Sequence, residues 1–255
     1  MEIIEKVNKQ YPLVRMENIH KRFDGVVALR GVDVDLDYNE IVGLVGDNGA
    51  GKSTLIKILS GAHPATEGTI YFEGKKVEIS NPKDAKEIGI ETIYQDLALA
   101  ENLDIASNIF LGREFKRSGL GRFLRMIDKK KMWQEAEKVI KSLGIEIGSV
   151  KTLVQDLSGG QRQAVAIGKT VYLRPKVIIM DEPTANISVK ERNRVLELTQ
   201  RLKKEGISLI FISHNLQEVF SIVDRVVVLN RGEKVGDKKI EDITIDEVIK
   251  LMIGR

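Results

Sequence analysis

Cysteine is absent from this chain of 255 residues, so the sequence suggests neither a disulfide framework nor a secreted protein. No apolar run approaches the roughly 20 residues that a membrane-spanning helix requires, and no apolar segment with a cleavage site opens the sequence. The formal net charge of +3 is small and spread over the chain, which argues against a nucleic-acid-binding protein. We therefore expect a cytoplasmic protein with one large α/β domain and room for a small subdomain.

The most informative stretch present is a glycine-rich loop after the apolar residues 41–45. It fits the pattern G-x-x-x-x-G-K-[ST], and a helical pattern follows it. Glycines let successive backbone N–H groups point at phosphate oxygens, and the start of the next helix adds its positive dipole end. We expect Lys52 to reach the β and γ phosphates and Ser53 to bind Mg²⁺. The alternative is a glycine-rich turn capped by a helix, which the preceding strand and the intact Lys-Ser pair disfavour. The predicted nucleotide-binding residues of this loop are Gly46, Asp47, Asn48, Gly49, Ala50, Gly51, Lys52, Ser53 and Thr54.

A second apolar run, residues 177–180, ends in two acids, Asp181 and Glu182. This pattern is typical of a strand buried in a parallel sheet that carries carboxylates to its ligand-binding edge. We expect Asp181 to hold Mg²⁺, directly or through water, and Glu182 to polarise an attacking water. The alternative is that the acids and Pro183 merely begin a helix.

A third segment places serine and glycines at the start of another helical pattern. Ser158, Gly159, Gly160 and Gln161 follow Leu157 and form a second anion-binding helix start. One nucleotide does not need two such sites on one subunit. The economical explanation is that the second site serves a nucleotide held by another copy of the chain.

With these segments the sequence resembles the ATP-binding cassette (ABC) ATPases over nearly its whole length. The family's phosphate loop matches residues 46–54, its signature matches residues 157–161, and its magnesium and base carboxylates match Asp181 and Glu182. The resemblance implies a P-loop NTPase (RecA-like) α/β core with an N-terminal antiparallel β subdomain and an inserted α-helical subdomain. It also implies ATP and Mg²⁺ as cofactors.

Three weaker positions gain meaning from the resemblance. Gln95 falls on the family's glutamine lid, which senses Mg²⁺ and the γ-phosphate, although alone it is an ordinary polar residue after a strand. His214 falls on the switch histidine that orients Glu182 and the water, although alone it would read as a hydrogen-bonded histidine at a strand end. Phe23 resembles the aromatic residue that stacks on adenine, although an aromatic residue beside a strand usually belongs to the core.

The resemblance further implies how the chain would work. Two copies would face each other head to tail and hold two Mg-ATP molecules between the phosphate loop of one and the signature of the other. The cassette would sit at the inner face of the cell membrane under two permease subunits, with a sugar-binding protein as an indirect partner and no nucleic acid.

The group of cassettes that this chain most resembles is that of the ribose, xylose and fructose importers. Ser188 stands where most ABC ATPases carry an aspartate, and in this group a serine is expected there. Many relatives carry two fused cassettes, whereas this sequence resembles the single-cassette, fructose-like branch. A lipid or drug exporter is the stronger rival, because the catalytic motifs are shared. A DNA-repair cassette would need a long coiled-coil insertion, and a translation-associated cassette normally carries two nucleotide domains.

The predicted organisation is a single ABC domain. Residues of about 11–95 and 157–255 would form the nucleotide-binding core with its antiparallel layer, and about 96–156 the helical subdomain. That helical segment is basic, which indicates either a solvated helical face or a surface near anionic lipid. Its basic residues are Arg113, Lys116, Arg117, Arg122, Arg125, Lys129, Lys130 and Lys131.

Overall fold

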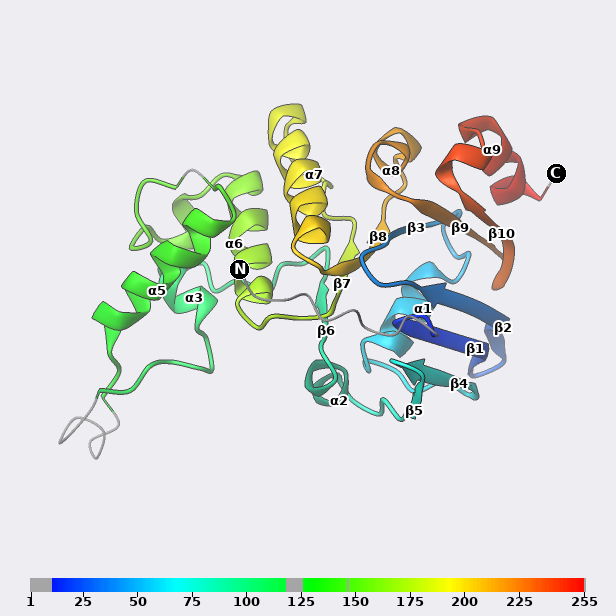
Figure 1. The fold of residues 1–255 in the computed structure, drawn as a ribbon, viewed down its shortest axis with the longest axis horizontal. Helices are drawn as coiled ribbons and strands as arrows, with labels where there is room; N and C mark the ends of the chain where they lie inside the picture. Colours follow the sequence, from blue (N-terminus) through cyan, green and yellow to red (C-terminus); the bar gives the residue numbers. More distant parts are fainter. Residues whose placement is uncertain (1–10, 118–125, 146, 255) are drawn as a thin grey trace. The chain divides into compact units, whose positions relative to one another are not determined.

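The computed structural model describes residues 11–117, 126–145 and 147–254. The chain divides into two compact units (Figure 1). The first unit contains the residues up to Thr92, then Pro175–Glu182, and the residues from Thr199 onward, and the second contains Ile93–Arg174 and Pro183–Leu198. Two of the basic residues considered above, Arg122 and Arg125, lie outside the described residues.

The first unit contains two sheets. The four-stranded sheet has the order β2-β1-β4-β5 and is antiparallel. The six-stranded sheet has the order β10-β9-β3-β8-β7-β6, in which β9, β3, β8 and β7 run parallel and β10 pairs antiparallel with β9. The strands of the first sheet are β1 (Val14–Phe23), β2 (Val26–Leu36), β4 (Glu67–Phe72) and β5 (Lys75–Val77). Those of the second are β3 (Ile41–Val45), β6 (Ile90–Ile93), β7 (Val177–Asp181), β8 (Ser208–Ile212), β9 (Arg225–Asn230) and β10 (Glu233–Lys239).

Burial follows the strand patterns of the sequence. β2 alternates buried and exposed positions over residues 32–36, as a sheet with one solvated face does. β3 and β8 are buried at every position, which explains their continuous apolar runs. The N-terminal antiparallel layer that the resemblance implies is therefore confirmed.

The helices of the first unit cover its six-stranded sheet. They are α1 (Lys52–Leu59), α2 (Pro82–Glu87), α8 (Leu216–Ile222) and α9 (Ile245–Ile253), with a short 3-10 helix η2 (Ile240–Asp242). α1 shares one hydrophobic core with residues of both sheets, including Val42 and Leu44 of β3. Gly43, between them, faces α8, where an added Cβ would stand 2.6 Å from Cγ1 of Val219. In Figure 1, α8 accordingly lies across the six-stranded sheet from α1.

The second unit is helical and has its own core. It contains α3 (Ile105–Ile109), α5 (Lys129–Ser142), the 3-10 helix η1 (Val154–Asp156) and α6 (Gly159–Val171). α7 (Val189–Lys204) begins in the second unit and ends in the first. The core joins α3, α5 and α6 around side chains such as Phe110, Ala136 and Val165. The predicted boundaries of the helical subdomain, about 96–156, stay a prediction, and the second unit contains that segment together with α6.

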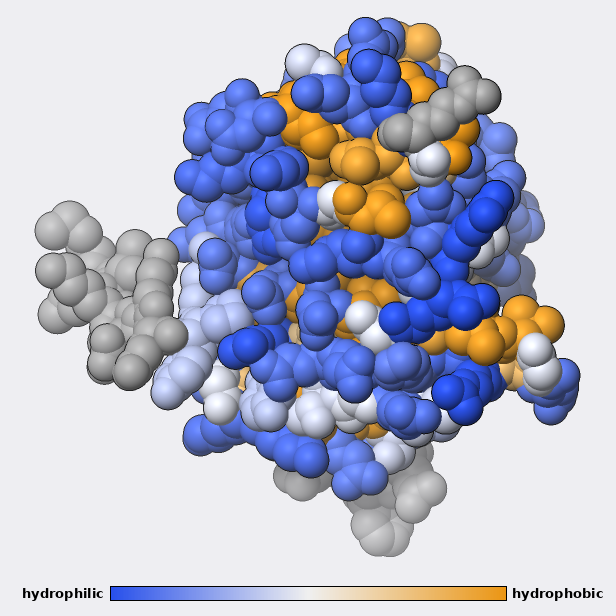
Figure 2. All heavy atoms as spheres, turned by 90° about the vertical axis from the view of Figure 1, so that its right-hand side faces the viewer, coloured by the Kyte–Doolittle hydropathy of each residue, from blue (hydrophilic) through white to orange (hydrophobic). Residues whose placement is uncertain are grey.

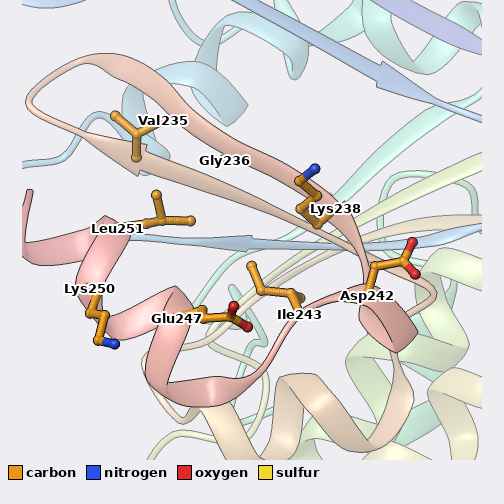
Figure 3. Close-up of a pocket in the computed structure, with 8 residues that line it drawn as sticks. All are labelled: Val235, Gly236, Lys238, Asp242, Ile243, Glu247, Lys250 and Leu251. Atoms are coloured by element: carbon orange, nitrogen blue, oxygen red, sulfur yellow. The ribbon is translucent and has the colours of Figure 1, made fainter. Parts of the chain in front are cut away.

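The first unit also carries a pocket of about 350 Å³ between β10 and α9. Figure 3 shows its lining, which contains both apolar and charged side chains: Val235, Gly236, Lys238, Asp242, Ile243, Glu247, Lys250 and Leu251. Figure 2 shows the side of the molecule on which α9 and β10 lie, with apolar patches among hydrophilic side chains. Ile249 and Ile253 of α9 are among the exposed apolar residues. None of the described residues that line this pocket is a predicted nucleotide-binding residue.

Over the described residues, no helix has both the length and the apolar character that crossing a bilayer requires.

Candidate nucleotide-binding site

The phosphate loop connects a buried strand to a helix, as its sequence predicts. β3 ends at Val45 and α1 begins at Lys52. Three glycines of the loop have positive φ angles: 152° at Gly46, 80° at Gly49 and 106° at Gly51. Residues with a Cβ rarely adopt these conformations, so glycine is needed for the chain to turn here. The loop therefore presents its backbone at the start of α1, where the N–H groups are suited to bind an anion.

Lys52 folds back over this loop. Its Nζ donates hydrogen bonds to the carbonyl oxygens of Gly46, at 2.6 Å, and Asp47, at 3.0 Å. Burial lowers the pKa of Lys52, and the negative charges of Glu182, Asp47 and Asp181 oppose that shift. The ammonium group thus lies at the loop, where it can pair with phosphate oxygens, and the carboxylates at the end of β7 act on it electrostatically.

Two glycines of this loop differ in what surrounds them, which gives a prediction with its own control. A Cβ at Gly46 would stand 2.3 Å from the carbonyl oxygen of Leu229, whereas a Cβ at Gly49 would meet nothing within 4 Å. We expect Gly46→Ala to lower the free energy of unfolding by about 2–4 kcal/mol and Gly49→Ala by about 1 kcal/mol, because only the first adds a steric clash to the backbone strain. Urea unfolding of both variants measures this. Equal losses would show that the clash with Leu229 is relieved at little cost.

The acidic pair lies at the end of β7 with the predicted histidine beside it. Glu182 has a positive φ of 51°, and its backbone N–H donates to the carbonyl oxygen of Ile212 at 3.0 Å. Nδ1 of His214 lies 2.8 Å from Oε2 of Glu182. The Glu182 side chain is only 17% exposed, whereas that of His214 is 79% exposed. A strained backbone held by its neighbours is common where a side chain must be aimed.

Burial sets the charge behaviour of both acids. It raises the pKa of Asp181, against the opposing charges of Lys52 and Lys57. It also raises the pKa of Glu182, against the opposing effects of His214 and Lys52 and with the neighbouring Asp181 as a further raising charge. A carboxylate with a raised pKa is a stronger base than an exposed one, which suits the role predicted for Glu182.

Phe23 lies at the last position of β1 and is 38% exposed. The ring of His63 meets it edge-on, with ring centroids 5.5 Å apart, and Nζ of Lys21 lies 4.8 Å from the centroid of the Phe23 ring. Lys21 is itself held by a 2.7 Å hydrogen bond to the carbonyl oxygen of Pro64. Phe23 is therefore an exposed, supported ring rather than a core residue. Sequence reasoning missed Lys21 and His63, because no motif marks them.

The signature motif begins α6 in the second unit. Ser158 is the N-cap residue: its hydroxyl accepts from the N–H of Gln161, whose Oε1 accepts from the N–H of Ser158 at 3.1 Å. The N–H of Gly160 donates to Oε1 of Glu191 at 3.2 Å. Glu191 was not predicted, although the S-x-x-E spacing from Ser188 is the signal of a capping box. Gln95 is an exposed residue just after β6 and also belongs to the second unit.

The phosphate loop, the start of α1 and Asp181 in the first unit fit a nucleoside triphosphate with Mg²⁺. Gly49 leaves open space where a Cβ would stand, and α1 has no side chain that caps its first turn among the described residues. Ser53, in that first turn, is exposed and offers a hydroxyl, and Asp181 is half-buried. Backbone N–H groups and a lysine suit phosphates, while a hydroxyl and a carboxylate suit the hard Mg²⁺ ion.

The comparisons with known proteins agree with this geometry. The ABC transporter family model matches residues 29–185. The chain belongs to the ABC transporter family. It is 47% identical over 240 residues to the xylose/arabinose import ATP-binding protein XylG of Sulfolobus acidocaldarius, covering 94% of this chain and 93% of that protein. It is 41% identical to the fructose import ATP-binding protein FrcA of Rhizobium meliloti, covering 96% and 95%.

A further sequence relative and a solved structure also match this ABC cassette. The ribose import ATP-binding protein RbsA of Caldanaerobacter subterraneus is 42% identical, and the match covers 96% of this chain but 48% of that protein. The solved structure of the ADP conformation of an ATP-binding cassette of an ABC transporter has a TM-score of 0.82 at 27% identity, covering 96% of this chain and all of that one. The predicted family and fold class, a P-loop NTPase core with an antiparallel layer and a helical subdomain, are confirmed, and as a member of this family the chain is an ATP-binding ATPase subunit.

Proposed function

We propose that this cassette hydrolyses ATP to power the import of a monosaccharide through separate membrane permease subunits. The observation that carries the proposal is the 2.8 Å contact between Oε2 of Glu182, which follows β7, and Nδ1 of His214, which follows β8, in the same unit as the phosphate loop. The relatives named as importers of xylose or arabinose, ribose and fructose support a sugar as the cargo. The exporter alternative has less support, because these relatives are all importers.

The residues act mainly by position and charge. Lys52 and the backbone N–H groups of the loop bind and neutralise phosphate oxygens, since phosphoryl transfer depends mostly on positioning and electrostatic stabilisation. Glu182 orients a water and accepts its proton, and His214 holds the Glu182 carboxylate at Oε2. When bound by Ser53 and Asp181, with Gln95 as a further predicted contact, Mg²⁺ supplies charge neutralisation on the β and γ phosphate oxygens.

The signature motif serves the nucleotide of a second copy. Ser158, Gly159, Gly160 and Gln161 form the start of α6, where the backbone N–H groups of the first turn and the positive end of the helix dipole favour an anion. Two copies arranged head to tail would place this helix start against the terminal phosphate bound by the partner copy. Loss of that phosphate removes the shared charge, and the pair of subunits then separates.

The transport proposal is tested by reconstitution. The cassette is placed in proteoliposomes with the permease that co-purifies with it from detergent extract, and sugar uptake is followed with the sugar-binding protein present. Xylose, arabinose, ribose and fructose form the first panel. We expect ATP-dependent uptake of one of them and stimulation of ATPase activity by the loaded binding protein. Stimulation by a lipid or drug with no sugar uptake would replace import by export.

The base-stacking role of Phe23 gives a prediction on nucleotide affinity. Stacking of a base on an aromatic ring contributes enough that Phe23→Ala should weaken ATP binding about tenfold or more. His63→Ala and Lys21→Met, which remove only the support of the ring, should weaken it less. Affinity for inorganic tripolyphosphate, which has no base, should not change in any of the three variants. Titration calorimetry measures both ligands, and a parallel fall for both would mean that the loop is disturbed instead.

A further inference from the structure

The signature motif in the second unit already has an anionic ligand supplied by the chain itself. Oε1 of Glu191 accepts the N–H of Gly160 at 3.2 Å, and the Ser158 hydroxyl contributes to lowering the pKa of this carboxylate. Oε2 of the same carboxylate accepts from the hydroxyl of Ser188 at 2.9 Å and from its N–H at 3.1 Å. One glutamate thus connects the start of α6 to the start of α7.

The two glycines of the motif permit this close approach. A Cβ at Gly160 would stand 2.5 Å from Cβ of Glu191, and a Cβ at Gly159 would stand 2.9 Å from Cγ2 of Ile187. Both distances are shorter than packed carbon atoms allow, so any larger residue would push the start of α7 away. The two glycines are therefore needed within one subunit, because they let Glu191 approach the N–H of Gly160.

The Glu191 carboxylate is ionised at neutral pH. Hydrogen bonds from the Ser158 side chain and from the side chain and backbone of Ser188 lower its pKa to about 2. Charge-assisted hydrogen bonds of this kind are about twice as strong as neutral ones. Ser158 and Gly160 are also the groups that, under the proposed function, receive the terminal phosphate held by a second copy. A backbone N–H makes one strong hydrogen bond, so two anions cannot both have it.

We propose that Glu191 is an internal ligand of the signature motif: it positions Ser158 and Gly160 in the free subunit and is displaced from Gly160 by the terminal phosphate of the nucleotide on the partner copy. This inference rests on the proposed function. The displacement requires little movement, because Oε2 keeps both contacts with Ser188 while Oε1 releases Gly160. ADP, which has no terminal phosphate, does not displace the carboxylate. Glu191 therefore sets how strongly ATP must bind before two subunits pair.

The test compares Glu182→Gln with the double variant Glu182→Gln, Glu191→Gln. Glutamine keeps the length of the side chain and an acceptor for Ser188, but it removes the charge that holds Gly160. With Mg-ATP, analytical ultracentrifugation should find the dimer of the double variant at a protein concentration lower by about tenfold or more, since a charge-assisted contact is replaced by a neutral one in both halves. With Mg-ADP both proteins should stay monomeric.

The chain offers a matched control in Glu247. It forms the same kind of capping box with Thr244 at the start of α9, with its Oε2 2.8 Å from both the backbone nitrogen and the hydroxyl oxygen of Thr244, but it belongs to the first unit and not to the unit of the signature motif. Added to Glu182→Gln, Glu247→Gln should leave the protein concentration at which the dimer forms unchanged. If the double variant Glu182→Gln, Glu191→Gln dimerises at the same protein concentration as Glu182→Gln, or only at a higher one, the inference is wrong. Glu191 then only caps α7 or supports the signature motif. If the Glu182→Gln parent itself stays monomeric with Mg-ATP, the proposed head-to-tail dimer is wrong, and the inference with it.

Discussion

Glu182→Gln is expected to bind Mg-ATP and to form a stable dimer, while its rate of hydrolysis falls by about 10²- to 10⁴-fold. The amide has the shape of the carboxylate and can still face His214, but it cannot accept the proton of an attacking water. The backbone of Glu182, with a φ of 51° and its N–H bonded to Ile212, does not depend on the side-chain charge, so the fold should persist.

Two measurements check this result. Phosphate release gives the hydrolysis rate, and size-exclusion chromatography with Mg-ATP gives the oligomeric state. Glu241→Gln is a suitable control, because Glu241 is a carboxylate of the same unit whose side chain is 73% exposed. Hydrolysis near the native rate would remove Glu182 as the base, and a monomer that binds Mg-ATP would contradict the proposed dimer.

The pH dependence of hydrolysis follows from the same residue. Burial raises the pKa of Glu182 above its ordinary value of 4.5. A general base acts in its ionised form, so the rate should rise with pH through this raised pKa rather than level off at 4.5. Under single-turnover conditions the remaining activity of Glu182→Gln should lack that rise. A rise that is identical in both proteins would assign the titration to another group.

The second large effect is expected on stability, from Arg225→Met. Arg225 begins β9, is 16% exposed, and donates from Nε to Glu40 at 2.8 Å and from Nη1 to Asp237 at 2.7 Å. Its Nη2 also donates to the carbonyl oxygen of Asp35 at 2.8 Å. Methionine fills similar space but leaves Glu40 without its charged partner and Asp237 with Lys234 alone, which costs about 3–5 kcal/mol of unfolding free energy.

Urea unfolding measures this loss, and an exposed pair provides the control. Lys239→Met breaks the 3.8 Å pair with Glu241, in which both side chains are about 70% exposed, and should cost less than about 1 kcal/mol. Arg225→Lys should fall between the two, because it keeps the charge but loses the forked hydrogen bonds. Equal losses in Arg225→Met and Lys239→Met would show that the Arg225 cluster is no more important than a surface pair.

The same cluster predicts how stability depends on pH. Burial acts to raise the pKa of Asp237, but hydrogen bonds from Arg225 and Lys234 outweigh it, so the pKa is lowered from 3.8. A lowered pKa means that the folded protein favours the ionised form. The stabilisation is therefore complete above pH 3.8 and is lost as the pH falls through the lowered value. In Arg225→Met this acid-range loss should become shallower.

The motifs of the first unit were predictable because each lies at the end of a strand with a clear apolar pattern. The phosphate loop follows β3, the acidic pair follows β7 and His214 follows β8, and parallel strands bring their carboxyl ends to one edge. Position along the chain therefore translated directly into position in space. The roles assigned to these residues, and to Gln95 and Ser158 in the second unit, stay predictions.

The supporting contacts were not predictable in the same way. His63 reaches Phe23 because the segment after α1 is hydrogen bonded to β1. For example, the N–H of Thr66 donates to the carbonyl oxygen of His20. Glu191 reaches Gly160 because two glycines allow a close approach between segments that are 31 residues apart. Such contacts depend on how closely two segments pack, where a few tenths of an ångström matter. The spacing of residues along the sequence does not determine this.

Gly43 has a consequence for how the site transmits change. Without a side chain at this position, Val219 of α8 packs directly on the main chain of β3. β3 leads into the phosphate loop, and α8 begins two residues after His214. A side chain can relieve a small displacement by changing its rotamer, but a main chain has no such freedom. The predicted triphosphate-binding loop and His214, the predicted partner of the base, are therefore expected to shift as one rigid body when a bound nucleotide changes.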